Sequence, residues 1–166
     1  AAAELTEAGA TSYATSKELA AQSDVIITML PDSPQVEQVI SGVDGILEGI
    51  QSGALFIDMS TIAPATAVNI YQLLKSKGVE ALDAQVSGGQ VGAIGASLSI
   101  MVGGTAAAFE RALPLFQAMG KNIVHIGEPG AGQMTKACNQ MIVGMTIQAV
   151  AEAFALAQKA GVDLEK

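Results

Sequence analysis

The chain alternates short, continuous apolar runs with stretches whose apolar positions follow a helical period. Five runs have the length and composition of β-strands, at residues 24–30, 54–59, 79–84, 97–104 and 122–127. Runs that are apolar throughout, rather than at every second position, are typical of strands covered on both faces. Strand and helix follow one another at the spacing of βαβ units, which predicts an α/β fold with a mostly parallel, doubly wound sheet.

Residues suited to helix ends lie between these runs. Ser16 or Thr15 is a suitable N-cap for the first of these helices and Thr105 for a later one, and Pro34 and Pro64 fit the first turn of a helix. The helical pattern that begins at about Ala131 continues nearly to the end of the chain and is longer than a typical globular helix. It predicts a helix that leaves this domain for another.

Polar loops rich in glycine or proline follow four of the apolar runs. They are "TMLPDSP", "DMSTIAP", "DAQVSGG" and "VHIGEPGAGQ". In a doubly wound sheet, ligands bind at the carboxyl ends of the strands. We therefore expect these loops to meet at one edge of the sheet and to form a binding site there.

Composition and charge limit the function classes. The 166 residues carry a formal net charge of −8 without a cluster of Lys and Arg, which argues against a nucleic-acid partner. Mean hydropathy is +0.42, but polar residues interrupt every apolar run of membrane-spanning length, so we expect a cytoplasmic protein without a membrane span. One cysteine, Cys138, and one histidine, His125, exclude a Cys/His zinc site, and no metal is expected.

The segment "GEPGAGQMTKACNQ", residues 127–140, offers the strongest candidate chemistry. Lys136 follows a glycine-rich turn on the first turns of the predicted helix, with Asn139 and Gln140 three and four residues further on. A lysine beside amides can hold a carbonyl oxygen and protonate it as negative charge develops. A surface lysine on an amphipathic helix would show the same pattern, and both interpretations stay open at this point.

A second candidate is Ser87-Gly88-Gly89, which follows the third apolar run within a glycine-rich span. A hydroxyl and unobstructed backbone N–H groups can hold a carboxylate, and glycine removes the Cβ that would block close approach. A tight turn is the alternative. Asp58 and Asp83, near strand ends, are interpreted as caps of loops.

Other polar and sulfur-containing side chains are interpreted as structural. His125 lies within an apolar strand and is expected to be packed rather than catalytic. Met134, Met141 and Met145 fall near helical spacing and are expected to fill a core.

Four ordered segments resemble signature segments of the β-hydroxyacid dehydrogenase family, which includes 3-hydroxyisobutyrate dehydrogenases and tartronate semialdehyde (2-hydroxy-3-oxopropionate) reductases. They are "DVIITMLPDSPQVEQV", "GALFIDMSTIAP", "DAQVSGGQVGAIGASLSIMVGG" and "GAGQMTKACNQMIVG", and they look most similar to the reductases. The resemblance implies a cofactor, NAD or NADP, and reduction of a small β-semialdehyde acid such as tartronate semialdehyde to D-glycerate. The alternatives are 3-hydroxyisobutyrate dehydrogenase activity and a truncated, non-catalytic ligand-binding module.

The resemblance also implies roles for individual residues. Lys136 matches the family's catalytic lysine. Glutamine at position 140 departs from the asparagine common there, which keeps the amide on a longer arm. The substrate-binding positions are Ser87, Gly88, Gly89, Asn139 and Gln140, and the cofactor-binding positions are Leu30, Pro31, Gln35 and Thr61.

The chain also lacks segments that the family has. The family begins with a glycine-rich dinucleotide fingerprint, and no G-x-G-x-x-G that opens a helix stands at the N-terminus here. We therefore expect a partial Rossmann-like domain at 1–130, without its first βαβ unit, and the start of the helical C-terminal domain at 131–166. The isolated chain is expected to bind cofactor weakly and turn over poorly or not at all, and the full-length protein to be a homo-oligomer with a small-molecule substrate.

Overall fold

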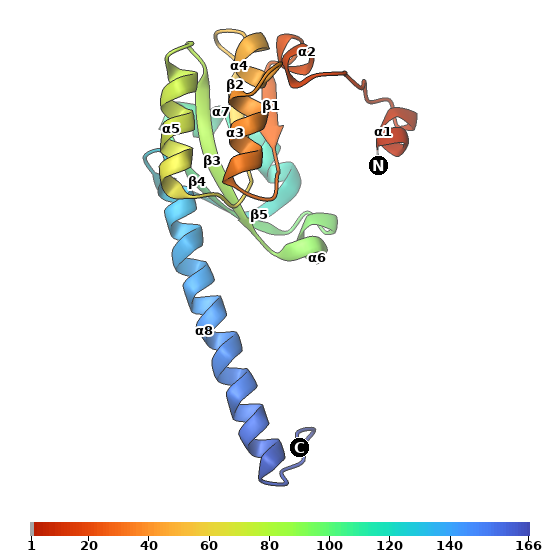
Figure 1. The fold of residues 1–166 in the computed structure, drawn as a ribbon, viewed down its shortest axis with the longest axis vertical. Helices are drawn as coiled ribbons and strands as arrows, with labels where there is room; N and C mark the ends of the chain where they lie inside the picture. The colour runs from red at the N-terminus through yellow and green to blue at the C-terminus, as the bar shows by residue number, and fades with distance from the viewer. Residues whose placement is uncertain (1) are drawn as a thin grey trace.

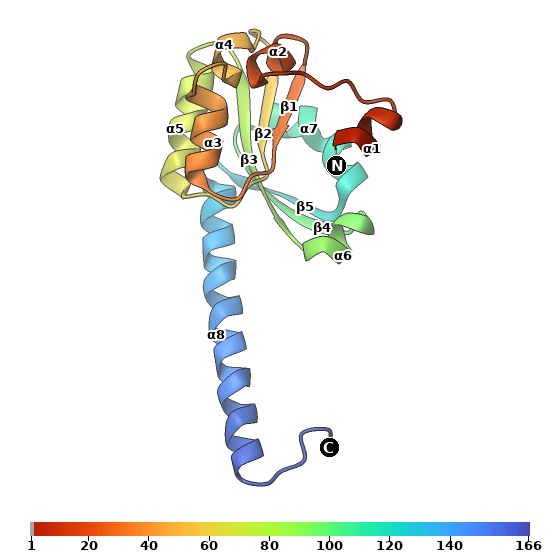
Figure 2. The same ribbon diagram turned by 45° about the vertical axis from the view of Figure 1, so that its right-hand side comes forward.

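A computed structural model describes residues 2–166 and places a five-stranded sheet at the centre, with helices on both faces (Figures 1 and 2). The strands are β1 (Val25–Thr28), β2 (Leu55–Asp58), β3 (Glu80–Ser87), β4 (Leu98–Gly103) and β5 (Gly120–Gly127). The helices are α1 (Ala2–Glu7), α2 (Ser16–Ala21), α3 (Ser33–Ser41), α4 (Ile46–Gly49), α5 (Pro64–Lys75), α6 (Gly89–Ile94), α7 (Ala106–Met119) and α8 (Ala131–Lys159). Each predicted strand is present, which confirms the α/β class.

The strands lie in the order β1-β2-β3-β4-β5, and the sheet reverses direction once. β1, β2 and β3 are parallel, β4 is antiparallel to β3, and β5 is parallel to β4. The prediction of a mostly parallel sheet is confirmed, with this one exception. Residues 88–97 join β3 to β4 and are too few for a parallel crossover, which needs a dozen or more, so the chain turns back.

β3 is long enough to serve two neighbours. Its first half pairs with β2 and its second half pairs with β4, with Asp83 in both ladders. Gly103, at the end of β4, lies opposite Asp83, and Gly127, at the end of β5, lies beside Gly103. The loops after β2 and β5 therefore meet near the middle of β3, although β5 runs the other way. Ser87 lies further along the same strand.

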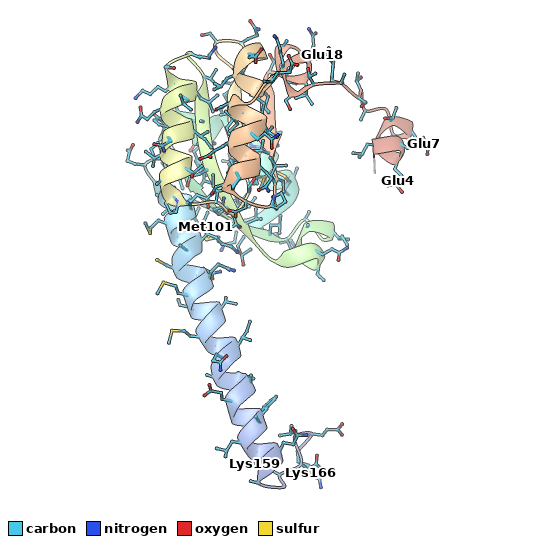
Figure 3. The ribbon with its side chains drawn as sticks, in the orientation of Figure 1. Glu4, Glu7, Glu18, Met101, Lys159 and Lys166 are labelled. Atoms are coloured by element: carbon cyan, nitrogen blue, oxygen red, sulfur yellow. The ribbon has the colours of Figure 1, made fainter. Side chains whose placement is uncertain are left out.

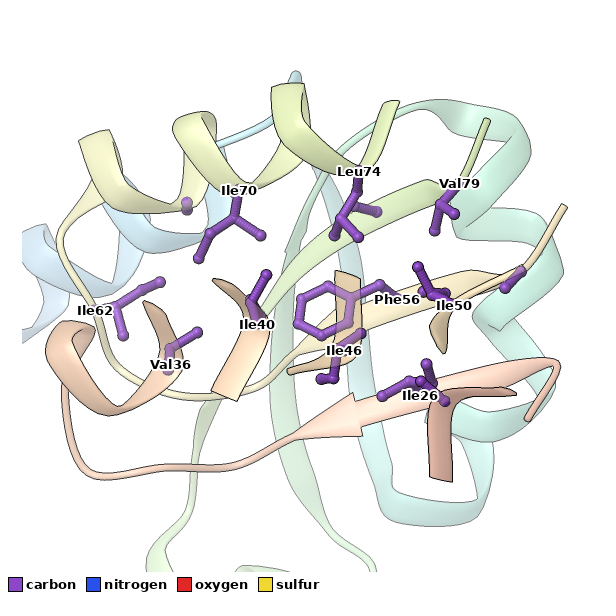
Figure 4. Packing of buried hydrophobic residues seen from close by; sticks show 14 residues of the cluster. Ile26, Val36, Ile40, Ile46, Ile50, Phe56, Ile62, Ile70, Leu74 and Val79 are labelled. Atoms are coloured by element: carbon purple, nitrogen blue, oxygen red, sulfur yellow. The ribbon is translucent and has the colours of Figure 1, made fainter. Parts of the chain in front are cut away.

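Apolar side chains pack on both faces of the central strands β2 and β3, which explains their continuous apolar runs, whereas Ile27 of β1 and Val124 of β5 are 44% and 43% exposed. On one face, α3, α4 and α5 pack over Ile26, Phe56 and Ala81 (Figure 4). On the other face, α7 packs over residues of β2, β3 and β4, with Phe116 completely buried. The doubly wound arrangement is confirmed.

The predicted capping residues begin their helices as expected. The Thr15 hydroxyl accepts a hydrogen bond from the backbone N–H of Glu18 at 3.1 Å, and the Thr105 hydroxyl accepts one from Ala108 at 3.2 Å. The short helices α4 and α6 were not predicted. α6 begins at a glycine-rich turn of low helix propensity, where Gly88 has a φ of 138°.

α8 is in contact with the sheet only through its first turns. It then extends away from the body, and its side chains project outward (Figures 1 and 3). Met134, Met141 and Met145 have exposed fractions of 55%, 69% and 73%. Their interpretation as core residues is therefore wrong for this chain, because nothing in the described residues covers the outer part of α8.

Candidate functional site

Asp83 anchors the start of α8. The N–H of Gly130 donates to one carboxylate oxygen of Asp83 at 2.7 Å, and the N–H of Gln133 donates to the other at 2.8 Å. Both donors belong to the first turn of a helix, which has no partners for them within the helix. A negative charge there is also favourable toward the helix dipole. Burial raises the pKa of the Asp83 carboxyl, and the backbone hydrogen bonds partly offset that rise.

Glycines bring α8 directly onto the sheet backbone. A Cβ on Gly132 would lie 2.5 Å from the carbonyl oxygen of Met101 and closer still to that of Asp83. A Cβ on Gly103 would lie 2.8 Å from the backbone nitrogen of Gly132. The first turn of α8 therefore sits against β3 and β4 with no space for a side chain between them. Part of the glycine pattern in the sequence serves this packing rather than a ligand.

Ser60 connects the loops that follow β1 and β2. Its hydroxyl accepts a hydrogen bond from the backbone N–H of Leu30 at 2.8 Å. Its own N–H donates to the Asp58 carboxylate at 3.2 Å, and the Thr28 hydroxyl donates to the same oxygen at 2.8 Å. Leu30 is thereby fixed beside the segment that carries Thr61. The two loops form one unit at the edge of the sheet.

Gln133 joins that unit to α8. Its side-chain NH₂ donates to the carbonyl oxygen of Ser60 at 2.8 Å, and its side-chain oxygen accepts from the N–H of Ile62 at 3.1 Å. The side chain of Gln85, on β3, donates to the same Ser60 carbonyl. Gln133 is 1% exposed. Sequence reasoning missed this residue, although its place one helical turn before Lys136 was a usable signal.

Lys136 lies on the buried side of α8, one turn after Gln133. It is 9% exposed, so the interpretation as a surface lysine is wrong. Among the described residues, no hydrogen bond or ion pair involves its ammonium group. Burying a charged group without a partner is costly, which makes this position suited to an oxygen supplied by a ligand.

Ser87 is the last residue of β3 and shares a sheet face with Asp83 and Gln85. Side chains two and four residues apart on a strand point to the same side, and α8 and the Ser60 carbonyl lie on that side. Gly88 and Gly89 follow with positive φ angles of 138° and 59°, which favour glycine. A Cβ on Gly89 would meet no atom within 4 Å, whereas one on Gly88 would lie 3.1 Å from the Leu98 side chain, so the turn is open only on the side of Gly89.

Asn139 and Gln140 lie one turn beyond Lys136 on α8. Asn139 is half-buried and Gln140 is exposed. The side-chain NH₂ of Asn139 donates to the side-chain oxygen of Gln140 at 3.3 Å. Both positions, three and four residues after Lys136, flank it on the surface of the helix, and Gln140 is the more exposed of the two.

The predicted cofactor contacts lie at the carboxyl ends of β1 and β2. Leu30 and Gln35 line an open groove together with Thr15, Asp44 and neighbouring residues of α2, α3 and the loop before α4. Thr61 does not line this groove, and the Ser60 hydroxyl joins its loop to Leu30. Leu30 is half-buried, and Pro31, Gln35 and Thr61 are exposed.

His125 lies on the opposite face of the sheet. Its ring stacks on Phe109 of α7 at a centroid distance of 5.1 Å, and its Nε2 lies 2.8 Å from the carbonyl oxygen of Gly104. The expectation that His125 is a packed residue is confirmed.

Asp58 differs from Asp83 in one respect that can be tested. Only one of its oxygens is hydrogen-bonded, and the other, in the described residues, has no partner. Burial is the largest cause that raises the pKa of its carboxyl above the ordinary 3.8. The folded chain therefore binds this proton more tightly than the unfolded chain, so stability falls as pH rises between 3.8 and the raised pKa.

We expect Asp58→Asn to be tolerated, because the amide oxygen can still accept both hydrogen bonds and the buried charge is gone. Its free energy of unfolding, relative to the parent, should rise with pH through this window and then level off. Urea unfolding at a series of pH values measures this. A variant whose relative stability falls with pH would show that the Asp58 charge is favourable when folded.

Comparison with known proteins decides the family. Residues 1–127 match the family model described as the NAD binding domain of 6-phosphogluconate dehydrogenase. Residues 130–166 match the model described as NAD-binding of NADP-dependent 3-hydroxyisobutyrate dehydrogenase.

The chain belongs to the β-hydroxyacid dehydrogenase family. Both models describe NAD-binding segments, which confirms the expected cofactor class, NAD or NADP. The family's dehydrogenase fold is also the fold seen here.

Individual relatives support this assignment. The chain is 45% identical over 160 residues to the 2-hydroxy-3-oxopropionate reductase of Escherichia coli, covering 96% of this chain and 55% of that protein. It is 43% identical over 159 residues to a 3-hydroxyisobutyrate dehydrogenase of Pseudomonas aeruginosa, covering 96% of this chain and 53% of that protein. A solved structure of a 3-hydroxyisobutyrate dehydrogenase of Mycobacterium tuberculosis with L-serine superposes on this chain with a TM-score of 0.89 at 39% identity. The superposition covers 98% of this chain and 55% of that one. The chain thus spans about half the length of the curated relatives it matches.

Proposed function

We propose that the whole protein is an NAD(P)-dependent dehydrogenase that interconverts a small β-semialdehyde acid and its hydroxy acid. The observation that carries this proposal is Lys136, which is buried yet has no partner among the described residues. It lies on the buried side of α8, and α8 contacts β3, the strand that ends in Ser87. A substrate oxygen would supply the acceptor that the buried ammonium group lacks.

In this proposal the chain's own residues bind the substrate and move one proton. The Lys136 ammonium group donates a proton to the alkoxide oxygen during reduction, and the neutral amine removes the hydroxyl proton during oxidation. The Ser87 hydroxyl and the N–H groups of Gly88 and Gly89 hold the substrate carboxylate. The amides of Asn139 and Gln140 complete the pocket.

The loops after β1 and β2 would hold the nicotinamide cofactor, which supplies or accepts the hydride when bound. The residues present fit such a group, because the groove lined by Leu30 and Gln35 is open and its edge is fixed by the bond from Leu30 to Ser60. Pro31 and Thr61 are exposed at the same ends of the strands and complete the proposed contacts.

We propose tartronate semialdehyde as substrate, with D-glycerate as product, and 3-hydroxyisobutyrate dehydrogenase activity as the alternative. The complete protein should oxidise NADH or NADPH in the presence of tartronate semialdehyde, with a higher kcat/KM than for methylmalonate semialdehyde. The reverse ratio would favour the alternative. If neither substrate is reduced, and NADH with a hydroxy acid does not raise the melting temperature, the enzyme proposal is wrong and a non-catalytic module is favoured.

The exposed part of α8 requires a cover in the whole protein. Within the described residues, α8 is the one helix long and apolar enough to cross a membrane; its window of 18 residues has a mean hydropathy of 1.4 and none of it is buried. A single such helix is a weak indication of a membrane span. We propose instead that 131–166 begins a helical domain, and that the remaining chain and a second copy cover it in a cytoplasmic homo-oligomer.

A further inference from the structure

The position of Lys136 depends on contacts that are independent of any ligand. Its helix begins on the Asp83 carboxylate, which uses both oxygens to accept backbone N–H groups of α8. One turn before Lys136, Gln133 binds the loop after β2. We propose that Asp83 and Gln133 are positioning residues for the reaction, because together they fix Lys136 relative to the loops after β1 and β2. This inference rests on the proposed function of Lys136.

Gln133 holds the backbone on either side of a single residue. Its side chain donates to the carbonyl of Ser60 and accepts from the N–H of Ile62, so the two bonds bracket Thr61. Thr61 is a proposed cofactor contact, and Lys136 is the proposed proton donor. One buried amide therefore connects the backbone at Thr61 to the helix turn that leads to Lys136.

Asp83 fixes the same helix to the strand that carries Ser87. Both oxygens of its carboxylate accept hydrogen bonds, so an amide cannot replace the carboxylate without losing one of these bonds. In Asp83→Asn the NH₂ group would face an N–H donor, and one bond would be lost together with the charge at the helix N-terminus. The first turn of α8 would then shift on a surface where Gly132 leaves no free space.

A small shift of this helix matters for catalysis more than for folding. Misplacing a reacting group by about 1 Å can lower a rate by about 10²-fold. Gln133 makes its bonds with the backbone of a loop rather than with the hydrophobic core, so its replacement should leave most of the packing in place. Loss of positioning can therefore be separated from loss of stability.

The test uses the complete protein with Asp83→Asn and Gln133→Met, and Lys136→Ala as a reference. Thr105→Ala is the matched control, because it also removes a side-chain cap from a helix N-terminus, on α7, which packs on the opposite face of the sheet. For each variant we would measure kcat, KM, the pH–rate profile and the melting temperature, with kinetics well below that temperature. Gln133→Met keeps the test decisive if Asp83→Asn does not fold.

We expect kcat in both variants to fall by about tenfold or more, with a smaller change in KM. One limb of the pH–rate profile should be lost in Lys136→Ala. The same limb should shift in Asp83→Asn and in Gln133→Met. Thr105→Ala should lower the melting temperature and leave kcat, KM and the pH–rate profile unchanged. Variants that lose stability but keep the parental kcat and pH profile would overturn this inference and leave the proposed function intact. A Lys136→Ala variant with parental kcat would overturn the proposed function itself.

Discussion

Replacing Lys136 by alanine in the complete protein is expected to lower kcat by about 10²–10⁴-fold, the range that a positioned proton donor contributes. Lys136 is buried on the sheet-facing side of α8 and has no protein partner among the described residues. Removing it would leave the developing alkoxide without a proton donor while leaving the other proposed substrate contacts in place. Steady-state oxidation of NADH or NADPH with the preferred semialdehyde measures the loss.

Two further variants separate proton transfer from charge. Lys136→Arg keeps a positive charge, but a guanidinium group cannot release its proton at neutral pH, so kcat should stay low even if substrate binding is partly kept. Lys159→Ala removes an exposed lysine from the last turn of the same helix and should leave kcat unchanged. Near-normal turnover in Lys136→Ala would show that this lysine is not the proton donor.

Gly132→Ala is expected to lower the free energy of unfolding of the chain by about 3 kcal/mol, because the added methyl group has no space. Its Cβ would press on backbone carbonyls of two paired strands, which cannot rotate away as a side chain could. The helix would have to move off the sheet and lose its bonds to Asp83. Urea unfolding monitored by circular dichroism measures the change.

Gly144→Ala is the matched control within the same helix. A Cβ at Gly144 would meet no atom within 4 Å. Alanine should therefore raise the free energy of unfolding by about 1 kcal/mol through its better helix propensity. Equal effects at the two positions would mean that close packing of α8 on the sheet is not what stabilises its first turn.

Much of the fold follows from local pattern. Continuous apolar runs predicted the strands, and Thr15, Thr105 and the prolines predicted where helices begin. These signals depend only on neighbouring residues, so they can be read from the sequence. The reversal between β3 and β4 was missed, although the shortness of 88–97 was sufficient to predict it. α6 was missed because glycine-rich sequence carries little helix propensity.

The site was less predictable because its contacts join distant parts of the chain. Asp83 was interpreted as the cap of a loop, whereas its carboxylate accepts from the backbone of Gly130 and Gln133 at the start of α8, 47 and 50 residues away, and no local pattern predicts those bonds. The burial of Lys136 could not be predicted from the sequence of α8, because the outer part of this helix is also apolar yet is covered by nothing in the described residues. The assignment of Lys136 to catalysis came from the family resemblance, and it remains a proposal.

The length of β3 has a consequence for substrate range. Asp83, which anchors the helix of Lys136, and Ser87, which is proposed to hold the carboxylate, stand four residues apart on one strand, about 13 Å along its axis. That separation cannot be adjusted, since inserting or deleting one residue would turn Ser87 to the other face. Selection for longer or bulkier substrates would therefore act on Asn139, Gln140 and the surfaces beyond α8, while the strand stays constant.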